Sequence, residues 1–368
     1  MDKIPLVDLT VQHGELAAEV LDAVRRVIES GSFVLGSPLE EFERAFAEYA
    51  GGGHFVGVAS GTDALELMVR AAGIGAGDEV IAPANSFIAT ALAVVRAGAT
   101  PALVDCDPAY LLMDPEAVEA CVTERTKAVI AVHLYGQMAP LERLEQLCAE
   151  RGLVLLEDCA QAHGATRLGR PAGSWGAAGA FSFYPSKNLG ALGDGGGVMT
   201  GSEQLARRVR ALRNHGSESN RLHPEMGFNS RLDNLQAAVL AAKLKRLSAW
   251  NEARRRAAAT YRSLLADLTR VVLPETLAGN DHVWHLFVVR VPDRDEVHAS
   301  LRADGIGAGI HYPLPIHLEG ACRFLGHGPG DFPNAEAASR EVLSLPLYPG
   351  ITQEQQEIVS ARLRKAVS

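Results

Sequence analysis

The chain has 368 residues and a formal net charge of −9, with nearly half of its residues apolar and about a fifth charged. This length exceeds what one hydrophobic core usually serves, so we expect two domains. The acidic balance excludes a non-specific nucleic-acid binder, which needs a basic surface, and no apolar run is long enough to span a bilayer.

The first residues and the cysteines indicate where the protein works. The start, MDKIPLVDLT, lacks the apolar segment and the small-residue cleavage site of a secretory signal. The five cysteines are scattered and show no CxxC spacing: Cys106, Cys121, Cys148, Cys159 and Cys322. They predict neither a disulfide framework nor a zinc site, and we expect no metal. We therefore expect a cytoplasmic protein that binds neither nucleic acid nor membrane.

Short β-branched or apolar runs alternate with helix-like stretches from about residue 54. Seven runs are expected to be strands: HFVGVAS (54–60), DEVIAPA (78–84), TPALVDCD (100–107), KAVIAVHLY (127–135), GLVLLEDC (152–159), AGAFSFY (178–184) and GGVMT (196–200). This alternation predicts crossover units, and hence a largely parallel sheet with helices on both faces. Ligands of such sheets bind at the carboxyl ends of the strands.

The second half of the chain has a different pattern. QAAVLAAKLKRLSAWNEARRRAAATYRSLL (236–265) predicts one long helix with leucines on its apolar face. Three of its basic residues are expected on a solvated face: Lys243, Lys245 and Arg246. HLFVVRV (285–291), a helix-like stretch and GIGAGIHY (305–312) then predict a smaller α+β unit. We expect a large domain over residues 1–246 and a small C-terminal domain over 247–368.

A single lysine, Lys187, stands where an apolar strand opens into a glycine-rich loop, in FSFYPSKNLGALGDGGGVMTG (181–201). Most lysines lie on solvated surface, but desolvation at a strand end lowers the pKa of the amine and makes it nucleophilic. Such a lysine can form a Schiff base with a carbonyl compound or with pyridoxal phosphate. A glycine-rich loop also occurs in ordinary turns and in dinucleotide-binding folds, although neither GxGxxG nor GxxxxGK[ST] is present here.

Three further strand ends carry candidate residues. Gly61 and Thr62 open a helix, which offers free backbone N–H groups to a phosphate or is a plain N-cap. Asp158 follows the apolar run LVLL, so it is costly to bury unless it pairs with a protonated pyridine nitrogen, caps a helix or forms a salt bridge. Phe87 follows another strand end, where its ring stacks on a flat cofactor or packs into the core.

Together the four loops supply what a pyridoxal-phosphate site needs. They offer a covalent anchor, a phosphate cup, a partner for the ring nitrogen and an aromatic ring to stack on the cofactor. All four follow strands of one alternating sheet, whose carboxyl ends meet along the same edge. The sequence therefore predicts a pyridoxal-phosphate site at this edge.

Several long motifs, in order along the chain, resemble the DegT/DnrJ/EryC1/StrS family of nucleotide-sugar aminotransferases from about residue 4 to the C-terminus. They are GTDALELMVRAAGIGAGDEVIAPANSFIATALAV, AVHLYGQ, VLLEDCAQAHGA, FSFYPSKNLGALGDGGGV, LRNHG, FNSRLDNLQAAVLAAKL and GIHYPLPIHL. The resemblance implies the α/β fold-type I (aspartate aminotransferase-like) architecture, with a mostly parallel central sheet flanked by helices and a smaller C-terminal α+β domain. It also implies a homodimer with active sites at the interface.

The resemblance further implies roles for residues around the cofactor. Lys187 would bind pyridoxal phosphate covalently and then carry the proton between the substrate carbon and the cofactor. Asp158 would pair with the pyridine nitrogen, and Phe87 would stack on the ring. Gln161 would lie against the ring near its hydroxyl, and His163 falls in the same motif.

The phosphate and the substrate would be bound by other motifs. The resemblance implies that Gly61, Thr62 and Ser182 bind the phosphate, and that Asn229 reaches it from the neighbouring subunit. The polar stretch 214–231 would form part of the sugar-nucleotide site. Its arginines and three further side chains would contact the substrate: Arg221, Arg231, Tyr184, His311 and Tyr312.

The lysine at position 187 favours transamination, because a dehydrating branch of the family carries histidine there. KNLGALGDGGGV, with Asp194 where many relatives have glutamate, most resembles members that act on 3-keto sugars. We therefore expect transfer of the amino group of L-glutamate to C3 of a dTDP-linked 3-keto-6-deoxyhexose. The alternatives are C4 amination of a 4-keto sugar and a regulatory protein that binds the cofactor without turnover. A dehydrogenase is disfavoured by the missing nucleotide fingerprint.

Overall fold

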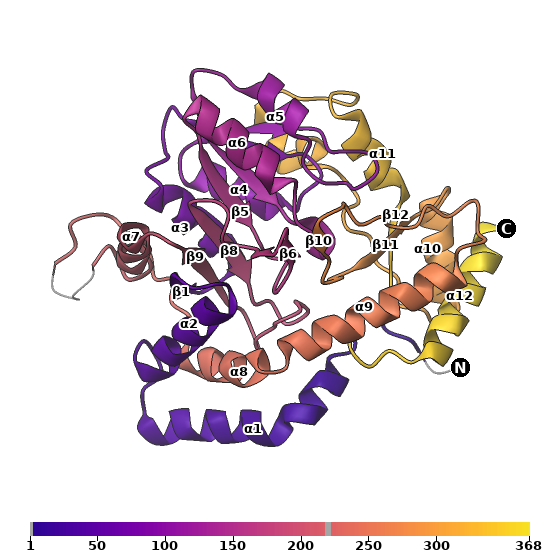
Figure 1. Cartoon of the computed structure of the whole chain (residues 1–368), viewed down its shortest axis with the longest axis horizontal. Helices are drawn as coiled ribbons and strands as arrows, with labels where there is room; N and C mark the ends of the chain where they lie inside the picture. Colours follow the sequence, from indigo (N-terminus) through magenta and orange to yellow (C-terminus); the bar gives the residue numbers. More distant parts are fainter. Residues whose placement is uncertain (1–2, 218–221) are drawn as a thin grey trace.

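The structure is a computed structural model that describes residues 3–217 and 222–368. A central sheet of seven strands, in the order β1-β9-β8-β5-β4-β2-β3, lies between two layers of helices (Figure 1). Its strands are β1 (His54–Val58), β2 (Glu79–Pro83), β3 (Thr100–Val104), β4 (Thr126–Val132), β5 (Val154–Asp158), β8 (Ala178–Ser182) and β9 (Gly196–Thr200). All seven coincide with runs predicted from the sequence.

The sheet is largely parallel, as the alternating pattern predicts. β2 pairs in parallel with β3 and β4, and β4-β5 and β5-β8 are parallel as well. β9 pairs antiparallel with both β1 and β8. The connection between β8 and β9 contains no helix, so the chain makes no crossover and returns in the opposite direction.

Two apolar cores lie on the two faces of the sheet. One core includes side chains of α2 (Ser37–Tyr49), α5 (Pro115–Cys121), α6 (Leu141–Arg151) and α8 (Asn234–Leu244). The other includes side chains of α3 (Gly61–Ala71), α4 (Ile88–Arg96) and α7 (Glu203–Arg213). Helices on both faces explain why the central strands are apolar throughout rather than alternating.

Strand β8 shows how the pleat places a site residue. Phe181 and Phe183 belong to the core beneath α2, whereas Ala178 and Ala180 belong to the core beneath α3. Because successive side chains point to opposite faces, Ser182 shares the α3 face with the two alanines. The small residues let α3 approach closely, and Ser182 consequently lies at the N-terminus of that helix.

The predicted long helix is two helices, which corrects the sequence interpretation. α8 ends at Leu244 and α9 (Leu247–Leu264) begins after a two-residue break. Lys243 is 2% exposed, not solvated, and its Nζ donates to the carbonyl of Gly190. The prediction failed because a lysine stem packs as an apolar side chain when its amine finds an acceptor. α1 (Leu9–Ser30) packs against α8.

The C-terminal elements form a further core, separate from those two, around a two-stranded antiparallel sheet. Figure 1 shows α9 running from α8 to this region. Its elements are β11 (Phe287–Arg290), α10 (Arg294–Ala303), β12 (Val342–Leu345) and α12 (Gln353–Val367). Ile4 joins this core and bridges Ile306, so the first described residues pack with the C-terminal elements. No helix among the described residues is long and apolar enough to cross a membrane.

A small three-stranded sheet was not predicted from the sequence. It consists of β6 (Thr166–Arg167), β7 (Arg170–Pro171) and β10 (Asn280–Asp281), in the order β10-β6-β7. Each strand has only two residues, too few to show the alternation that identifies a strand. β10 brings the segment before β11 against the loop that follows β5.

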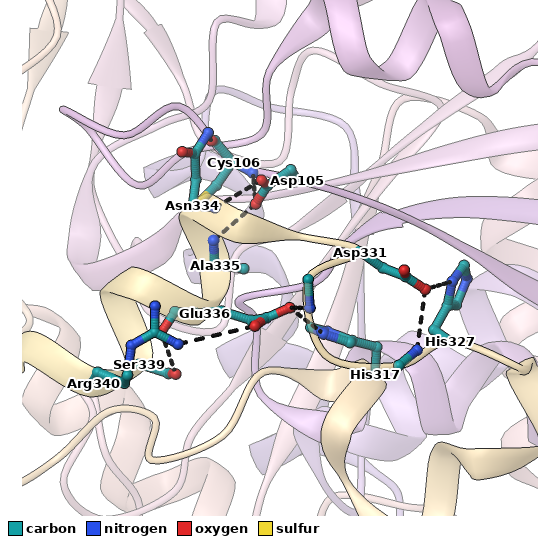
Figure 2. A network of polar contacts seen from close by, with 12 residues as sticks. Asp105, Cys106, His317, His327, Asp331, Asn334, Ala335, Glu336, Ser339 and Arg340 are labelled. Atoms are coloured by element: carbon teal, nitrogen blue, oxygen red, sulfur yellow. Dashed lines mark hydrogen bonds and ion pairs between the residues drawn. The ribbon is translucent and has the colours of Figure 1, made fainter.

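One carboxylate fastens the segment between α10 and β12 to the central sheet (Figure 2). This segment contains the short helices η2 (Ile316–Leu318) and η3 (Gly320–Leu325) and the helix α11 (Pro333–Glu341). Asp105, just past β3, accepts the backbone N–H groups of Asn334 and Ala335, each at 2.8 Å. It thereby caps the first turn of α11 from a distant part of the chain.

We expect Asp105→Asn to lower the free energy of unfolding by about 1 kcal/mol, because an amide has one acceptor oxygen where the carboxylate has two. Urea unfolding followed by circular dichroism measures the change. Glu124→Gln removes the same charge from an exposed loop and is the control, with an expected change within about 0.5 kcal/mol. Equal effects of the two substitutions would contradict the capping role.

Candidate active site

A cavity of about 470 Å³ opens at the carboxyl ends of β1, β2, β4, β5 and β8. It brings together most residues predicted from the sequence: Gly61, Thr62, Phe87, Asp158, Gln161, Ser182, Tyr184, Lys187, His311 and Tyr312. A larger groove, of about 910 Å³, lies between α1, α2 and α8 and contains none of them. The chemistry therefore belongs to the smaller cavity.

The N-terminus of α3 faces this cavity. Ser60 caps the helix through its side chain, which accepts the N–H of Asp63 at 3.1 Å, and through its carbonyl, which accepts that of Ala64. The N–H groups of Gly61 and Thr62 have no acceptor among the described residues, so two donors remain for a ligand. A Cβ on Gly61 would lie 2.5 Å from the Cβ of Ser182, so only glycine allows this approach. The donors and the helix dipole suit a phosphate.

Asp158 is the last residue of β5 and is 6% exposed. Its carboxylate accepts from the Thr90 hydroxyl at 2.9 Å and from the Ala160 N–H at 3.1 Å. No cationic side chain of the described residues pairs with it directly, and burial raises its pKa above the usual value. A buried carboxylate that faces a cavity and has no direct cationic partner fits a ligand that carries a protonated nitrogen.

Lys187 lies in the turn after β8, where its backbone N–H donates to the Tyr184 carbonyl at 2.9 Å. Its side chain is half-buried and lines the cavity. Desolvation lowers the pKa of its amine to about 8, and the charge of Asp158 partly opposes this shift. About a tenth of the amine is therefore uncharged, and nucleophilic, at pH 7, far more than for an ordinary lysine.

The loop that carries His311 and Tyr312 closes the cavity from the C-terminal side. Gln161 joins it to the sheet: its Oε1 accepts the Tyr135 N–H at 2.6 Å, and its Nε2 donates to the Tyr312 hydroxyl at 3.1 Å. The rings of Tyr312 and Phe87 lie 5.3 Å apart. The His311 carbonyl accepts from the Tyr135 hydroxyl at 2.5 Å. An aromatic wall for a flat ligand is thus formed by residues distant in sequence.

Several predicted residues do not line the cavity of their own chain. Asn229 is exposed and pairs with Asn214 in an isolated bridge, and Arg231 donates to the side chain of Asn214 at 3.1 Å. Arg221 lies outside the described residues. His163 is fully buried against the rings of Phe181 and Phe183, behind the cavity.

The structure adds cavity residues that the sequence analysis did not single out, among them Ser86, His133 and His285. His133 follows β4, so the strand-end argument applied to Asp158 would have found it. His285 precedes β11 in the C-terminal region and carries no such signal. Only the packing of that region against the sheet brings it to the cavity.

His133, Glu157 and Cys159 lie close together and are buried, but their hydrogen bonds leave no lone pair for a metal on the histidine. Nδ1 of His133 accepts the Ala139 N–H at 3.3 Å, so Nε2 carries the proton and donates to Glu157 at 3.0 Å. Glu157 also accepts three backbone N–H groups between residues 173 and 176. This cluster anchors the loop before β8.

Fold and cavity together define an α/β enzyme with a desolvated lysine, a buried carboxylate and a helix N-terminus in one site. Residues 15–364 match the DegT/DnrJ/EryC1/StrS aminotransferase family, and the chain belongs to this family. It is an aminotransferase of the fold type that the resemblance implied.

Among its relatives, the dTDP-3-amino-3,4,6-trideoxy-alpha-D-glucose transaminase of Streptomyces venezuelae is 48% identical, over 96% of this chain and 93% of that protein. A pleiotropic regulatory protein of Geobacillus stearothermophilus is 44% identical, over 98% of this chain and 97% of that protein. The structure of S. venezuelae DesV in complex with a ketimine intermediate superimposes with a TM-score of 0.98 at 46% identity, covering 100% and 99% of the two chains. The structure of NtdA from Bacillus subtilis with bound PMP superimposes with a TM-score of 0.91 at 34% identity, covering 100% of this chain and 86% of that chain.

We expect the reaction of Lys187 with cyanate, in the full-length protein without cofactor, to show a midpoint near pH 8, because only the uncharged amine reacts. Mass spectrometry of the peptide that contains Lys187 measures the rate. Asp158→Asn should move the midpoint down by up to about one pH unit, because the carboxylate favours the charged amine. A midpoint that rises in this variant would contradict the assignment.

Proposed function

We propose that this protein is a pyridoxal-phosphate-dependent aminotransferase that transfers the amino group of L-glutamate to C3 of a dTDP-linked 3-keto-6-deoxyhexose. The observation that carries the proposal is the juxtaposition of Lys187, Asp158 and the free N–H groups of Gly61 and Thr62 in one cavity. The bound PMP of NtdA and the sugar transaminase from S. venezuelae support the cofactor and the substrate class.

The residues of the cavity fit the cofactor group by group. The N–H groups of Gly61 and Thr62, with the hydroxyl of Ser182, would hold its phosphate, and Asp158 would hold its ring nitrogen in the protonated form. Phe87 would lie against its ring, and Gln161 beside the ring. When bound, the cofactor supplies an electron sink for the carbon that gains or loses the amino group.

Lys187 would hold and move the proton of the reaction at Nζ. Its pKa of about 8 lies near the working pH, where an amine both accepts and returns a proton readily. Asp158 prevents the pKa from falling further, so the charged form stays accessible.

Amination at C3 is supported by the relatives and by the loop after Lys187. Three relatives are named as transaminases of dTDP-3-amino sugars. The loop carries Asp194, as the C3 resemblance implies, and Asp194 lines the cavity. The name of the G. stearothermophilus relative keeps a regulatory role as the second candidate, but the lysine, the carboxylate and the phosphate donors in this chain favour turnover.

A homodimer with shared active sites completes the proposal. Lys187 is the one lysine or arginine among the described residues that line the cavity. A nucleotide diphosphate and the carboxylates of glutamate require more cationic donors than this. Arg231 and Arg221 of a second copy would supply the cationic donors, and its Asn229 would add a neutral donor to the phosphate, since Asn229 and Arg231 do not line the cavity of their own chain.

The division into domains and the cellular location are also proposals. The division into a large domain, residues 1–246, and a small domain, residues 247–368, falls in the break between α8 and α9. A cytoplasmic location is proposed because the five cysteines, which are free in the structure, suggest no oxidising environment.

We expect Lys187→Ala to lower turnover of L-glutamate with the 3-keto sugar by about a thousandfold or more, because both the covalent anchor and the proton carrier are lost. The wild-type protein should be yellow and should lose this colour on addition of L-glutamate. Lys127→Ala, on the exposed side of β4, is the control and should keep full turnover. Faster turnover of the 4-keto isomer would overturn the C3 assignment.

We expect mixed dimers of Lys187→Ala and Asn229→Ala chains to regain activity that neither variant has alone. One of the two sites in each mixed dimer combines an intact Lys187 with an intact Asn229 of the other chain. Random mixing should therefore recover about a quarter of wild-type turnover. Mixing two differently tagged Lys187→Ala chains is the control. No recovery, with dimers present, would show that each site is built from one chain.

A further inference from the structure

Two buried polar side chains next to the cavity are not used by the proposed function: Asn188 and His285. Asn188 directly follows Lys187 and is 1% exposed, and His285 lines the cavity at 6% exposure. Nδ1 of His285 lies 3.1 Å from Oδ1 of Asn188. The backbone of His285 is itself held, because buried Arg254 donates to the carbonyls of Trp284 and His285.

Two backbone carbonyls set the direction of the hydrogen bonds around Asn188. Nδ2 of Asn188 donates to the Val283 carbonyl at 2.9 Å, and a carbonyl can only accept. The amide of Asn251 donates to the His163 carbonyl at 2.8 Å, so its Oδ1 is free to accept the second proton of Asn188 Nδ2, also at 2.9 Å. Both donors of Asn188 are therefore occupied, and its Oδ1 is an acceptor.

This direction determines the tautomer of His285. Since Oδ1 of Asn188 can only accept, Nδ1 of His285 must carry the proton. Nε2 then carries a lone pair, and none of the described residues donates a hydrogen bond to it. His285 lines the cavity, so it offers this lone pair, not a proton, to the groups around Lys187.

The charges around Lys187 keep this arrangement neutral. Burial, and then the charge of Lys187, lower the pKa of His285 well below its usual value. The same causes lower the pKa of His163 to about 3 and that of His311 to about 4. The charge of Asp158 raises the pKa of Lys187 without a direct ion pair, so one carboxylate and three neutral imidazoles act on the amine. His311 is bound to Ser344, and His163 packs against phenylalanines.

We propose that Asn188 fixes His285 in the Nδ1–H tautomer so that Nε2 accepts a hydrogen bond from Nζ of Lys187, which makes His285 a positioning residue for the amine. The structure contains no hydrogen bond between the two side chains, but both line the same cavity. The proposal requires that rotation about the lysine side-chain bonds carries Nζ to Nε2 when the amine is not attached to a ligand. Nζ of Lys187 donates no hydrogen bond to any of the described residues. The role of His285 in catalysis rests on the proposed function. The hydrogen bond itself involves only residues of this chain and can be tested without the reaction.

The test uses His285→Asn and His285→Gln in the full-length protein without cofactor. An asparagine amide replaces Nδ1–H and keeps the bond to Asn188, but it has no atom at the position of Nε2. A glutamine oxygen reaches that position. Cyanate labelling of Lys187 against pH is the readout, with thermal unfolding as the check on folding. Lys243, a second buried lysine with a pKa of about 8 outside the cavity, is the control in the same digest.

We expect His285→Asn to lower the labelling midpoint of Lys187 by about 0.5 to 1 pH unit, because the charged amine loses its acceptor. His285→Gln should restore the wild-type midpoint, and the midpoint of Lys243 should not move in either variant. An unchanged midpoint in His285→Asn would overturn the proposal. A rise of the Lys187 midpoint in both variants would also overturn it, because such a rise would indicate that water has entered the cavity. Labelling requires no aminotransfer, so the outcome does not depend on whether glutamate reacts.

A second measurement covers the case in which a variant does not fold. ¹⁵N-labelled histidine in the wild-type protein reports the tautomer directly, and the signal of His285 is identified by its loss in whichever His285 variant folds or by its shift in Asn188→Ala. We expect a protonated Nδ1 and an unprotonated Nε2 throughout pH 6 to 9, the working range assumed for a neutral imidazole. A protonated Nε2 at His285 would overturn the proposal.

Discussion

The site depends on one electrostatic constraint: an amine and a carboxylate are both withdrawn from water at the carboxyl edge of a parallel sheet. Burial favours the uncharged form of each, lowering the pKa of Lys187 and raising that of Asp158, while their opposite charges counteract both shifts. Because no direct ion pair joins Asp158 to a described cation, the carboxylate stays available to a ligand. Neutral imidazoles around Lys187 leave this balance undisturbed.

Backbone groups contribute to the polarity of the cavity alongside its polar side chains. The open N–H groups of α3 provide the positive end, and a glycine there allows Ser182 to approach. Two carbonyls, of Val283 and His163, decide which way the amides of Asn188 and Asn251 point, and thereby the tautomer of His285. Backbone positions follow from the fold, so a ligand site built on them is rigid before any ligand arrives.

The C-terminal elements complete what the sheet begins. Asp105 fastens α11 to the end of β3, and Gln161 joins the loop after β5 to Tyr312. None of these contacts has a sequence signal, because each joins residues more than a hundred positions apart. The failed prediction for Lys243 has the same origin: its amine finds the Gly190 carbonyl only after α8 has packed against the glycine-rich loop.

The sequence by itself determined the seven strands of the central sheet, the helices between most of them and the candidates at the strand ends, because period, turn residues and apolar runs are local properties. It also placed Lys187, Asp158, Gly61 and Phe87 at one edge, since the carboxyl ends of parallel strands must meet there. The tertiary structure alone decided the break between α8 and α9, the burial of Lys243, and the arrival of His285 at the cavity. These depend on long-range packing and on hydrogen-bond partners that local pattern does not specify.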